Sequence, residues 1–313
     1  MRIIVTGSLG YDYIMNFSGR FADRIMPDKL HQISLSFLAD KLSKNLGGTA
    51  GNLAYTLKLL GEEPVILSSA GNDFTDYRDF LEKHGISLEG ITVANDEPCG
   101  SYHVITDSDD NQIGAFYTGA TKYNKNLSLE STKQSDFVVI GPNDPKAMKN
   151  FVTECIKRKF RYMYDPAFQI GNFSPEELKS AIENAELVIG NDYEIALIEQ
   201  KLEISHEELI LMGPKAVITT LGAKGAIIET RHEAIHIKPA KAKNVSDPTG
   251  AGDAFRGGFL AGYLNGMDLP VAGQMGAVAA VYTVEKYGTV THHYSKEQFR
   301  KRYEENYMLP LPL

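Results

Sequence analysis

Short apolar runs of strand-forming residues recur along the chain, and they restrict its fold more than any other feature. They are continuous rather than alternating, as in strands that a parallel sheet buries on both faces. The runs cover residues 3–6, 65–68, 137–140, 162–164, 187–189, 217–220 and 226–229. Helical patterns lie between them, including an apolar stripe of Ala50, Leu53, Leu57 and Leu60. This alternation predicts an α/β fold, a three-layer sandwich with helices on both faces of a mostly parallel sheet.

Two regions break this rhythm with extended segments of alternating character. The first supplies pieces at about 10–18 and 31–38. The second, about 98–119, indicates a hairpin around the acidic turn at 107–111. We expect these pieces to form a small β-sheet lid, so that residues 1–313 make one α/β domain with a discontinuous lid.

Composition excludes several classes of function. The net charge is −8 and no block of Lys or Arg stands out, so nucleic acid is not an expected partner. No run approaches the roughly 20 apolar residues of a membrane span, and the first residues lack the pattern of a signal peptide. We therefore expect no membrane partner and a cytoplasmic location.

The segment Asp247-Pro-Thr-Gly-Ala-Gly-Asp253 carries the strongest indication of chemistry. Gly250, Ala251 and Gly252 suit a turn at the mouth of a helix, where free N–H groups and the helix dipole bind anions. Asp253 is out of place in a simple phosphate site, but it suits a base that deprotonates an attacking hydroxyl. The dipole should also keep its carboxylate ionised near neutral pH. The segment therefore predicts a phosphoryl-transfer centre, although a capped turn before a packing helix is the simpler interpretation.

Further polar motifs follow predicted strands, at the edge where open α/β sheets bind ligands. Asn191 and Glu194 suit either a capping box or a Mg²⁺ site that acts through water. The loop from Thr219 to Gly225 suits either a tight turn or a nucleotide site. In the second interpretation, the hydroxyls of Thr219 or Thr220, the Gly222 backbone and the Lys224 charge would meet a triphosphate.

Near the N-terminus, Gly47-Gly48-Thr-Ala-Gly51-Asn52 opens a predicted helix. Asn52 is an amide in an apolar helical start, where it suits substrate hydroxyls, and Gly48 would let those hydroxyls approach the backbone. Asp12, just after the first strand, suits a carboxylate that accepts two vicinal hydroxyls. Neither G-x-x-x-x-G-K-[ST] nor a strand followed by G-x-G-x-x-G occurs, which argues against a P-loop protein or a nicotinamide dehydrogenase.

Together these motifs resemble the ribokinase-like (PfkB) sugar and nucleoside kinases over nearly the whole chain. Residues 247–253 are similar to that family's C-terminal signature, Gly47 to Gly61 to its N-terminal signature, and Asn191-x-x-Glu194 to its magnesium motif. Within the family, Gly19-Arg-Phe-Ala-Asp23 and Asp253-Ala-Phe-Arg256 most resemble the bacterial adenosine kinase branch.

The resemblance implies ATP as phosphate donor, Mg²⁺, K⁺ as an activator and a homodimer formed through the lid. It implies a nucleoside site in which Tyr102 and Phe116 stack on the base, with the full set being Ser8, Asp12, Ser36, Gly48, Asn52, Tyr102, Phe116, Phe168 and Gln169. Tyr102 departs from the family, where Phe is frequent. ATP would contact Asn191, Thr219, Thr220, Gly222, Lys224, Gly225 and Gly252.

The expected reaction is transfer of the γ-phosphate of ATP to the 5′-hydroxyl of a nucleoside, adenosine first, to give AMP. Asp253 would act as base, and the backbone N–H groups of Ala251, Gly252 and Asp253 would stabilise the transferring group. A kinase of a free sugar such as ribose or fructose is the main alternative. A non-catalytic nucleotide-binding protein with this fold is a second.

Overall fold

The computed structural model describes residues 1–313 apart from 27–28, 30–31, 33, 110 and 312–313. Its large sheet runs in the order β13-β12-β11-β10-β9-β8-β1-β4-β5. The strands are β1 (Ile3–Thr6), β4 (Pro64–Ala70), β5 (Ile91–Val93), β8 (Phe137–Ile140), β9 (Arg161–Tyr164), β10 (Leu187–Asn191), β11 (Ala216–Thr220), β12 (Ala226–Glu229) and β13 (Ala234–Ile237). Pairing is parallel from β11 to β5, whereas β12 and β13 are antiparallel. The predicted mostly parallel sheet is confirmed.

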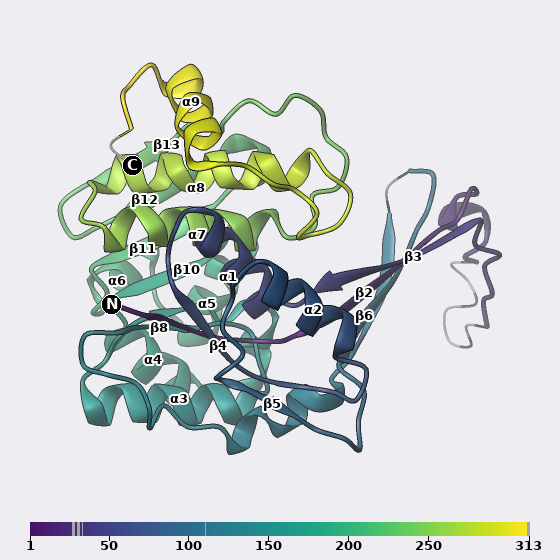
Figure 1. Ribbon diagram of the computed structural model, residues 1–313, viewed down its shortest axis with the longest axis horizontal. Helices are drawn as coiled ribbons and strands as arrows, with labels where there is room; N and C mark the ends of the chain where they lie inside the picture. The colour runs from purple at the N-terminus through teal and green to yellow at the C-terminus, as the bar shows by residue number, and fades with distance from the viewer. Residues whose placement is uncertain (27–28, 30–31, 33, 110, 312–313) are drawn as a thin grey trace.

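Helices cover both faces of this sheet, because its strands are apolar on both sides. Ile3 and Val5 of β1 face one buried cluster, whereas Ile4 faces the other. The first face carries α1 (Thr49–Leu59), α2 (Thr75–Lys83), α7 (Ala251–Leu264), α8 (Leu269–Val284) and α9 (Lys296–Tyr307). The second carries α3 (Pro145–Arg158), α4 (Pro175–Glu183), α5 (Asp192–Leu202) and α6 (His206–Leu211). Figure 1 shows α7, α8 and α9 on one side of the sheet and α3 and α4 on the other.

A smaller sheet projects from the side of this body (Figure 1) and forms the predicted lid. Its order is β3-β2-β6-β7, and its strands are β2 (Gly10–Asn16), β3 (Lys41–Gly47), β6 (Gly100–Thr106) and β7 (Gln112–Tyr117). The hairpin prediction is confirmed. The short 3₁₀ helices are η1 (Phe21–Asp23), η3 (Gly119–Asn126), η4 (Ala167–Asn172) and η5 (Gly222–Lys224).

One lid prediction was wrong: the piece expected at 31–38 does not supply a strand in its described residues, and β3 at 41–47 takes that place in the sheet. Residues 34–38 are not in a strand, and residues 31 and 33 lie outside the described part of the chain. Phe37 instead packs against Phe17 and Phe21, with ring centroids 5.1 and 5.0 Å away. The apolar pattern therefore indicated an aromatic cluster rather than a strand.

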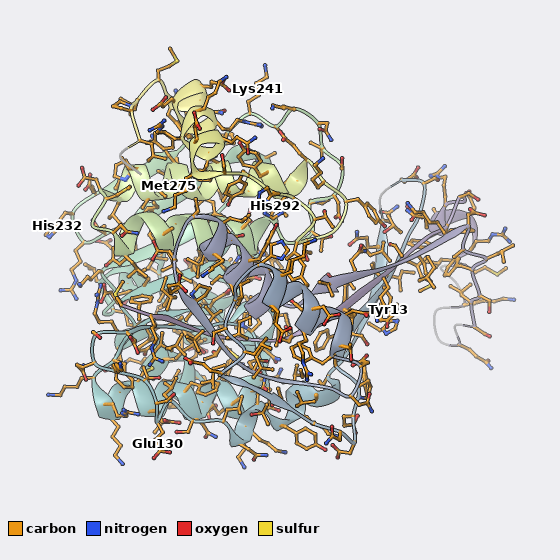
Figure 2. All side chains as sticks on the ribbon, viewed as in Figure 1. Tyr13, Glu130, His232, Lys241, Met275 and His292 are labelled. Carbon is orange, nitrogen blue, oxygen red and sulfur yellow. The ribbon has the colours of Figure 1, made fainter. Side chains whose placement is uncertain are left out.

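Close packing of α7 against α8 fixes the position of the helix that carries Asp253. A Cβ on Gly258 would lie 2.6 Å from the Met275 carbonyl oxygen and 2.9 Å from the Ala279 Cβ. Met275 is fully buried between the two helices (Figure 2). Because a larger residue at 258 would separate the helices, this glycine keeps the start of α7 in place.

Candidate active site

The turn at 247–253 leads directly into α7. Gly250 caps the helix with φ 78°, a conformation that glycine adopts without strain. Asp247 holds the turn, since its carboxylate accepts the N–H groups of Thr249 at 2.9 Å and of Gly288 at 3.0 Å. The Ala251 N–H donates to the Pro248 carbonyl at 3.1 Å. Gly252 and Asp253 follow in the first turn of the helix, where N–H groups lack an intrahelical acceptor.

Asp253 lies in the first turn of α7 beside Asn52 of α1. The Asn52 Nδ2 is 2.8 Å from the Asp253 Oδ2. Burial raises the pKa of Asp253; Arg256 and the Asn52 hydrogen bond oppose this, and Glu194 adds to it. Desolvation is therefore the largest influence on this carboxyl group in the ligand-free protein, and it acts against the helix dipole.

Arg256 is a buried cation beside the candidate site that the motif analysis quoted but did not interpret. Its guanidinium forms a buried ion pair with Asp165: Nε lies 2.6 Å from Oδ2, and one terminal N–H group donates to Oδ1 at 3.1 Å. Asp165 follows β9, so the pair ties α7 to the sheet edge and places a cation beside Asp253. An arginine within an apolar, glycine-rich helix was the signal that pointed to it.

A polar cavity of about 140 Å³ lies between the lid and the turn. Asp12 and Tyr102 face it from neighbouring strands, together with Ser246, Asp247, Pro248 and Thr249 of the turn. Asp12 pairs in register with Tyr102, and Tyr102 pairs with Phe116, so the three side chains form a row across one face of the lid. Tyr287, Asn16 and Gln112 also line the cavity and were not predicted.

The row is shaped by two glycines that leave room for its side chains. A Cβ on Gly47 would lie 2.3 Å from the Asp12 Oδ2, and one on Gly114 would lie 2.4 Å from the Tyr102 hydroxyl oxygen. Burial, followed by the charges of Asp253 and Asp247, raises the pKa of Asp12 to about 7. The cavity thus presents a titratable carboxylate beside an aromatic ring.

Other residues predicted to bind the acceptor do not line this cavity. Phe116 and Phe168 are exposed, with ring centroids 6.2 Å apart across the gap between lid and body. Gln169 donates its side-chain N–H to the Asn143 carbonyl at 2.7 Å. Ser8 caps α1 by accepting the Thr49 N–H at 3.3 Å, beside Gly48 at φ 90°. Ser36 is exposed and is not among the lining residues.

A second, mainly apolar cavity of about 440 Å³ lies on the other side of the turn. Four of the residues predicted to contact ATP line it: Thr220, Gly222, Gly225 and Gly252. Its remaining walls are apolar, formed by Ala223, Pro239, Ala240, Ala242, Val245, Pro248, Ala251, Phe255, Ala277, Ala280, Val281 and Val284. The turn at 247–253 therefore separates a polar cavity from an apolar one, and Pro248 lines both.

The remaining predicted nucleotide residues lie outside this cavity. Thr219 alternates with Thr220 along β11, and its buried hydroxyl has no partner within the described residues. Lys224 is exposed. Asn191 and Glu194 form both hydrogen bonds of a capping box at 2.8 Å, so the structural interpretation of this pair is observed.

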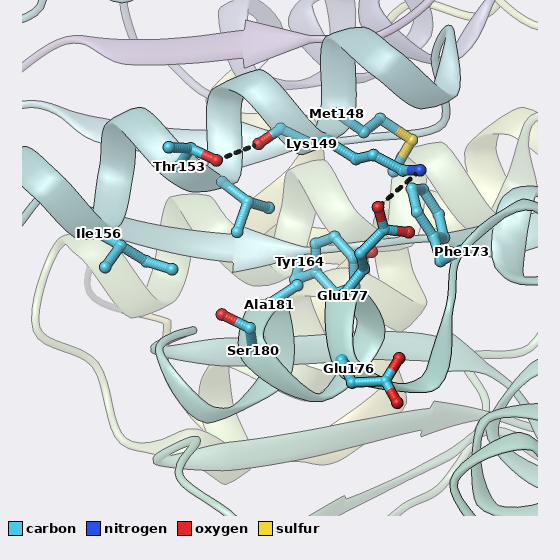
Figure 3. Close-up of a pocket in the computed structure, with 11 residues that line it drawn as sticks. Met148, Lys149, Thr153, Ile156, Tyr164, Phe173, Glu176, Glu177, Ser180 and Ala181 are labelled. Atoms are coloured by element: carbon cyan, nitrogen blue, oxygen red, sulfur yellow. Dashed lines mark hydrogen bonds and ion pairs between the residues drawn. The ribbon is translucent and has the colours of Figure 1, made fainter.

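A further cavity of about 320 Å³ lies between α3 and α4, with no residue shared with the turn (Figure 3). The ion pair of Lys149 with Glu177 at 2.8 Å bridges it. Among the described residues, no helix is long and apolar enough to cross a membrane.

Comparison with known proteins places this geometry in a family. The model of the pfkB family of carbohydrate kinases matches residues 11–295. A nucleoside kinase of Methanothermobacter thermautotrophicus is 32% identical over 93% of this chain and 91% of its own length.

Solved structures agree with this assignment. Burkholderia thailandensis nucleoside kinase in complex with inosine superposes with a TM-score of 0.91 at 32% identity, over 98% of this chain and 99% of the other. The same enzyme in complex with ADP-inosine gives a TM-score of 0.89 at 33% identity, over 98% and 97%. The predicted ribokinase-like fold is confirmed, and the chain belongs to the pfkB family of carbohydrate kinases.

Proposed function

We propose that this protein is an ATP-dependent nucleoside kinase that phosphorylates the 5′-hydroxyl of a purine nucleoside, with adenosine as the first substrate to test. The observation that carries the proposal is the register of Asp12 with Tyr102 on the lid face beside the turn that holds Asp253. Adjacent strands lie about 4.8 Å apart, which matches the spacing between a ribose and its base. A free sugar would leave the aromatic part of this row without a partner.

In this proposal each cavity holds one substrate. The Asp12 carboxylate accepts the 2′- and 3′-hydroxyls, and Tyr102 stacks on the base with Phe116 beyond it. Asn52 and the backbone at Gly48 contact the sugar, and Ser8, Ser36, Phe168 and Gln169 lie around the entrance. Stacking contributes roughly 1–3 kcal/mol per base in other systems. The relatives named as nucleoside kinases, and the inosine complex of one of them, support this assignment.

The apolar cavity suits the adenine and ribose of ATP, with Thr220, Gly222 and Gly225 at one wall. The γ-phosphate would then reach the turn, where the Gly252 and Asp253 N–H groups point toward an anion. Asp253 takes the proton of the 5′-hydroxyl, the oxygen attacks the γ-phosphorus, and ADP leaves. Thr219, Lys224 and Asn191 do not line this cavity, and in this proposal they would contact the phosphates of ATP from the strand ends around it.

Glu194 and Asn191 fit a Mg²⁺ ion held largely through water. No group of three or more Asp, Glu, His or Cys side chains forms a metal site in the part of the chain that the structure describes. A carboxylate and an amide at the sheet edge suit an ion that takes its other ligands from water and phosphates. When bound, Mg²⁺ would neutralise part of the negative charge on the phosphates of ATP.

We also propose a homodimer through the lid. The face opposite the Asp12 row exposes Leu42 on β3 and Ile113 and Tyr117 on β7. Apolar side chains gathered on one sheet face suit a second copy. Analytical ultracentrifugation tests this, and a monomer over the whole micromolar range would overturn it.

A substrate panel tests the proposed activity. Purified protein with ATP and Mg²⁺ is given adenosine, inosine, guanosine, cytidine, ribose and fructose, each with and without K⁺, and ADP release is measured. We expect turnover with purine nucleosides and none with ribose. Turnover with free sugars alone would favour the sugar kinase, and no acceptor-dependent ADP release would favour a binding protein.

A further inference from the structure

A line of hydrogen-bonding atoms connects the lid to Asp253. The Thr289 hydroxyl oxygen lies 2.7 Å from the Leu46 carbonyl oxygen on β3 and 2.8 Å from the Asn52 Oδ1. The Asn52 Nδ2 lies 2.8 Å from the Asp253 Oδ2. Thr289 and Asn52 are 3% and 6% exposed, so water does not readily replace these contacts.

The threonine has one hydrogen for two acceptors. If Asp253 is ionised, Asn52 presents its NH₂ group to the carboxylate and needs the Thr289 hydrogen for its own oxygen. The Leu46 carbonyl then faces a hydroxyl oxygen at 2.7 Å with no hydrogen between them. This arrangement leaves one close contact unsatisfied.

If Asp253 carries a proton, a rotation of the Asn52 side-chain amide by about 180° gives every one of these atoms a hydrogen-bond partner. Asp253 donates to the Asn52 oxygen, the amide NH₂ donates to Thr289, and Thr289 donates to Leu46. Every buried polar atom of the line then has a partner, which buried groups strongly favour. The proton on Asp253 is the only one gained from solvent.

We propose that Thr289 is a positioning residue: through Asn52 it favours the protonated form of Asp253 while the Leu46 carbonyl of the lid lies against it. Moving β3 away would release the Thr289 hydrogen to Asn52 and favour the carboxylate. The lid and the base are thus linked through one hydroxyl. The proposal rests on Asp253 as the base in the proposed function, but its test does not need turnover.

Charged and titratable groups from several elements also face Asp253, and they stay unchanged in the test. They are Arg256 on α7, Glu194 on α5, Asp165 after β9, Asp12 on β2 and Tyr77 on α2. Burial already raises the pKa of Asp253 above that of an exposed aspartate.

The experiment is a titration of ligand-free protein labelled with ¹³C-aspartate, followed by NMR and assigned with Asp253→Asn. Thr289→Val removes two hydrogen bonds from the protonated arrangement but only one from the ionised arrangement. We expect it to lower the pKa of Asp253 by about one unit, the equivalent of one net hydrogen bond. Thr289→Ser, which keeps the hydroxyl, should titrate like the native protein.

Thr291→Val is the matched control, because the Thr291 hydroxyl donates within the same loop, to the Tyr287 and Gly288 carbonyls. It should leave the titration unchanged. An unchanged or raised pKa of Asp253 in Thr289→Val would overturn the proposal, since a threonine that only held the carboxylate form would raise it. If Thr289→Val does not fold, Thr289→Ser still tests the proposal. Because serine keeps the hydroxyl, a titration of Asp253 in Thr289→Ser that departs from the native curve would also overturn it.

Discussion

The two cavities beside the 247–253 turn differ in how they are built. The apolar cavity comes from the body alone, from β11, the η5 loop and the small side chains of α7 and α8. The polar cavity needs both the lid and the body, and side chains such as Asp12, Tyr102 and Tyr287 face it. The apolar cavity can recognise a ligand by its shape and through backbone groups. The polar cavity suits a ligand that has hydroxyl groups and an aromatic ring.

Under the proposed function, this difference assigns separate tasks to the two cavities. The cavity lined by alanine, glycine and valine would bind ATP, the substrate that every reaction shares. The cavity lined by a carboxylate and an aromatic ring on separate strands would determine which acceptor enters. A substitution in one cavity should therefore change either KM for ATP or KM for the nucleoside, but not both. The following predictions test this.

The largest effect should come from the residue between the cavities. Asp253→Asn keeps the shape and the Asn52 contact but removes the base, so we expect kcat to fall at least about 100-fold with both substrates still bound. Steady-state kinetics and calorimetry measure the two parts. Asp79→Asn, an exposed carboxylate on α2, is the control. Near-normal turnover in Asp253→Asn would remove this residue from the mechanism.

Asp12→Asn should damage the acceptor side alone. Hydrogen bonds to a charged group contribute about 1.5–3 kcal/mol, so we expect KM for the nucleoside to rise about 10- to 100-fold. KM for ATP should stay within about twofold. A comparable rise in both values would show that the cavities are not independent.

Ala280→Leu should damage the donor side alone. Ala280 of α8 lines the apolar cavity, and a larger side chain there would occupy the space proposed for ATP. We expect KM for ATP to rise roughly tenfold, the lower range for overfilling a close-packed site. The nucleoside KM is the internal control, and an unchanged KM for ATP would place the donor elsewhere.

The smallest effect concerns pH. The pKa of Asp12 is raised to about 7, so its carboxylate form grows as pH rises from 6 to 7. Because the carboxylate accepts the ribose hydroxyls, nucleoside affinity should increase roughly fivefold over this range. Calorimetry without ATP measures it apart from chemistry. Asp12→Asn should show a flat profile, and the same slope in that variant would assign the titration to another group.

The body could be predicted from the sequence because its strands are buried on both faces and read as continuous apolar runs. β1, β8 and β12 match their predicted bounds. The strand β3 could not be predicted in this way. Its residues, Lys41-Leu-Ser-Lys-Asn-Leu-Gly47, are mostly exposed or half-buried, and they are held in a strand by pairing with β2 rather than by an apolar pattern of their own. The small strands β5 and β13 were missed for the same reason.

The part of the candidate site that lies within one continuous segment could be predicted from the sequence. The 247–253 turn is local, so its shape follows from neighbouring residues. Thr289 and Asn52 are 237 positions apart, and no spacing in the chain relates them. The burial that raises the pKa of Asp253 was also not predictable, because desolvation depends on residues packed from several elements, which a motif does not describe.

The in-register row on the lid has an evolutionary consequence. Asp12, Tyr102 and Phe116 each come from a different strand, whereas the strands are joined through their backbones. Under the proposed function, a single codon change could thus alter one contact to the acceptor without disturbing the strand pairing that holds the other two residues. Divergence toward new acceptors can proceed one position at a time, while the donor chemistry is inherited unchanged.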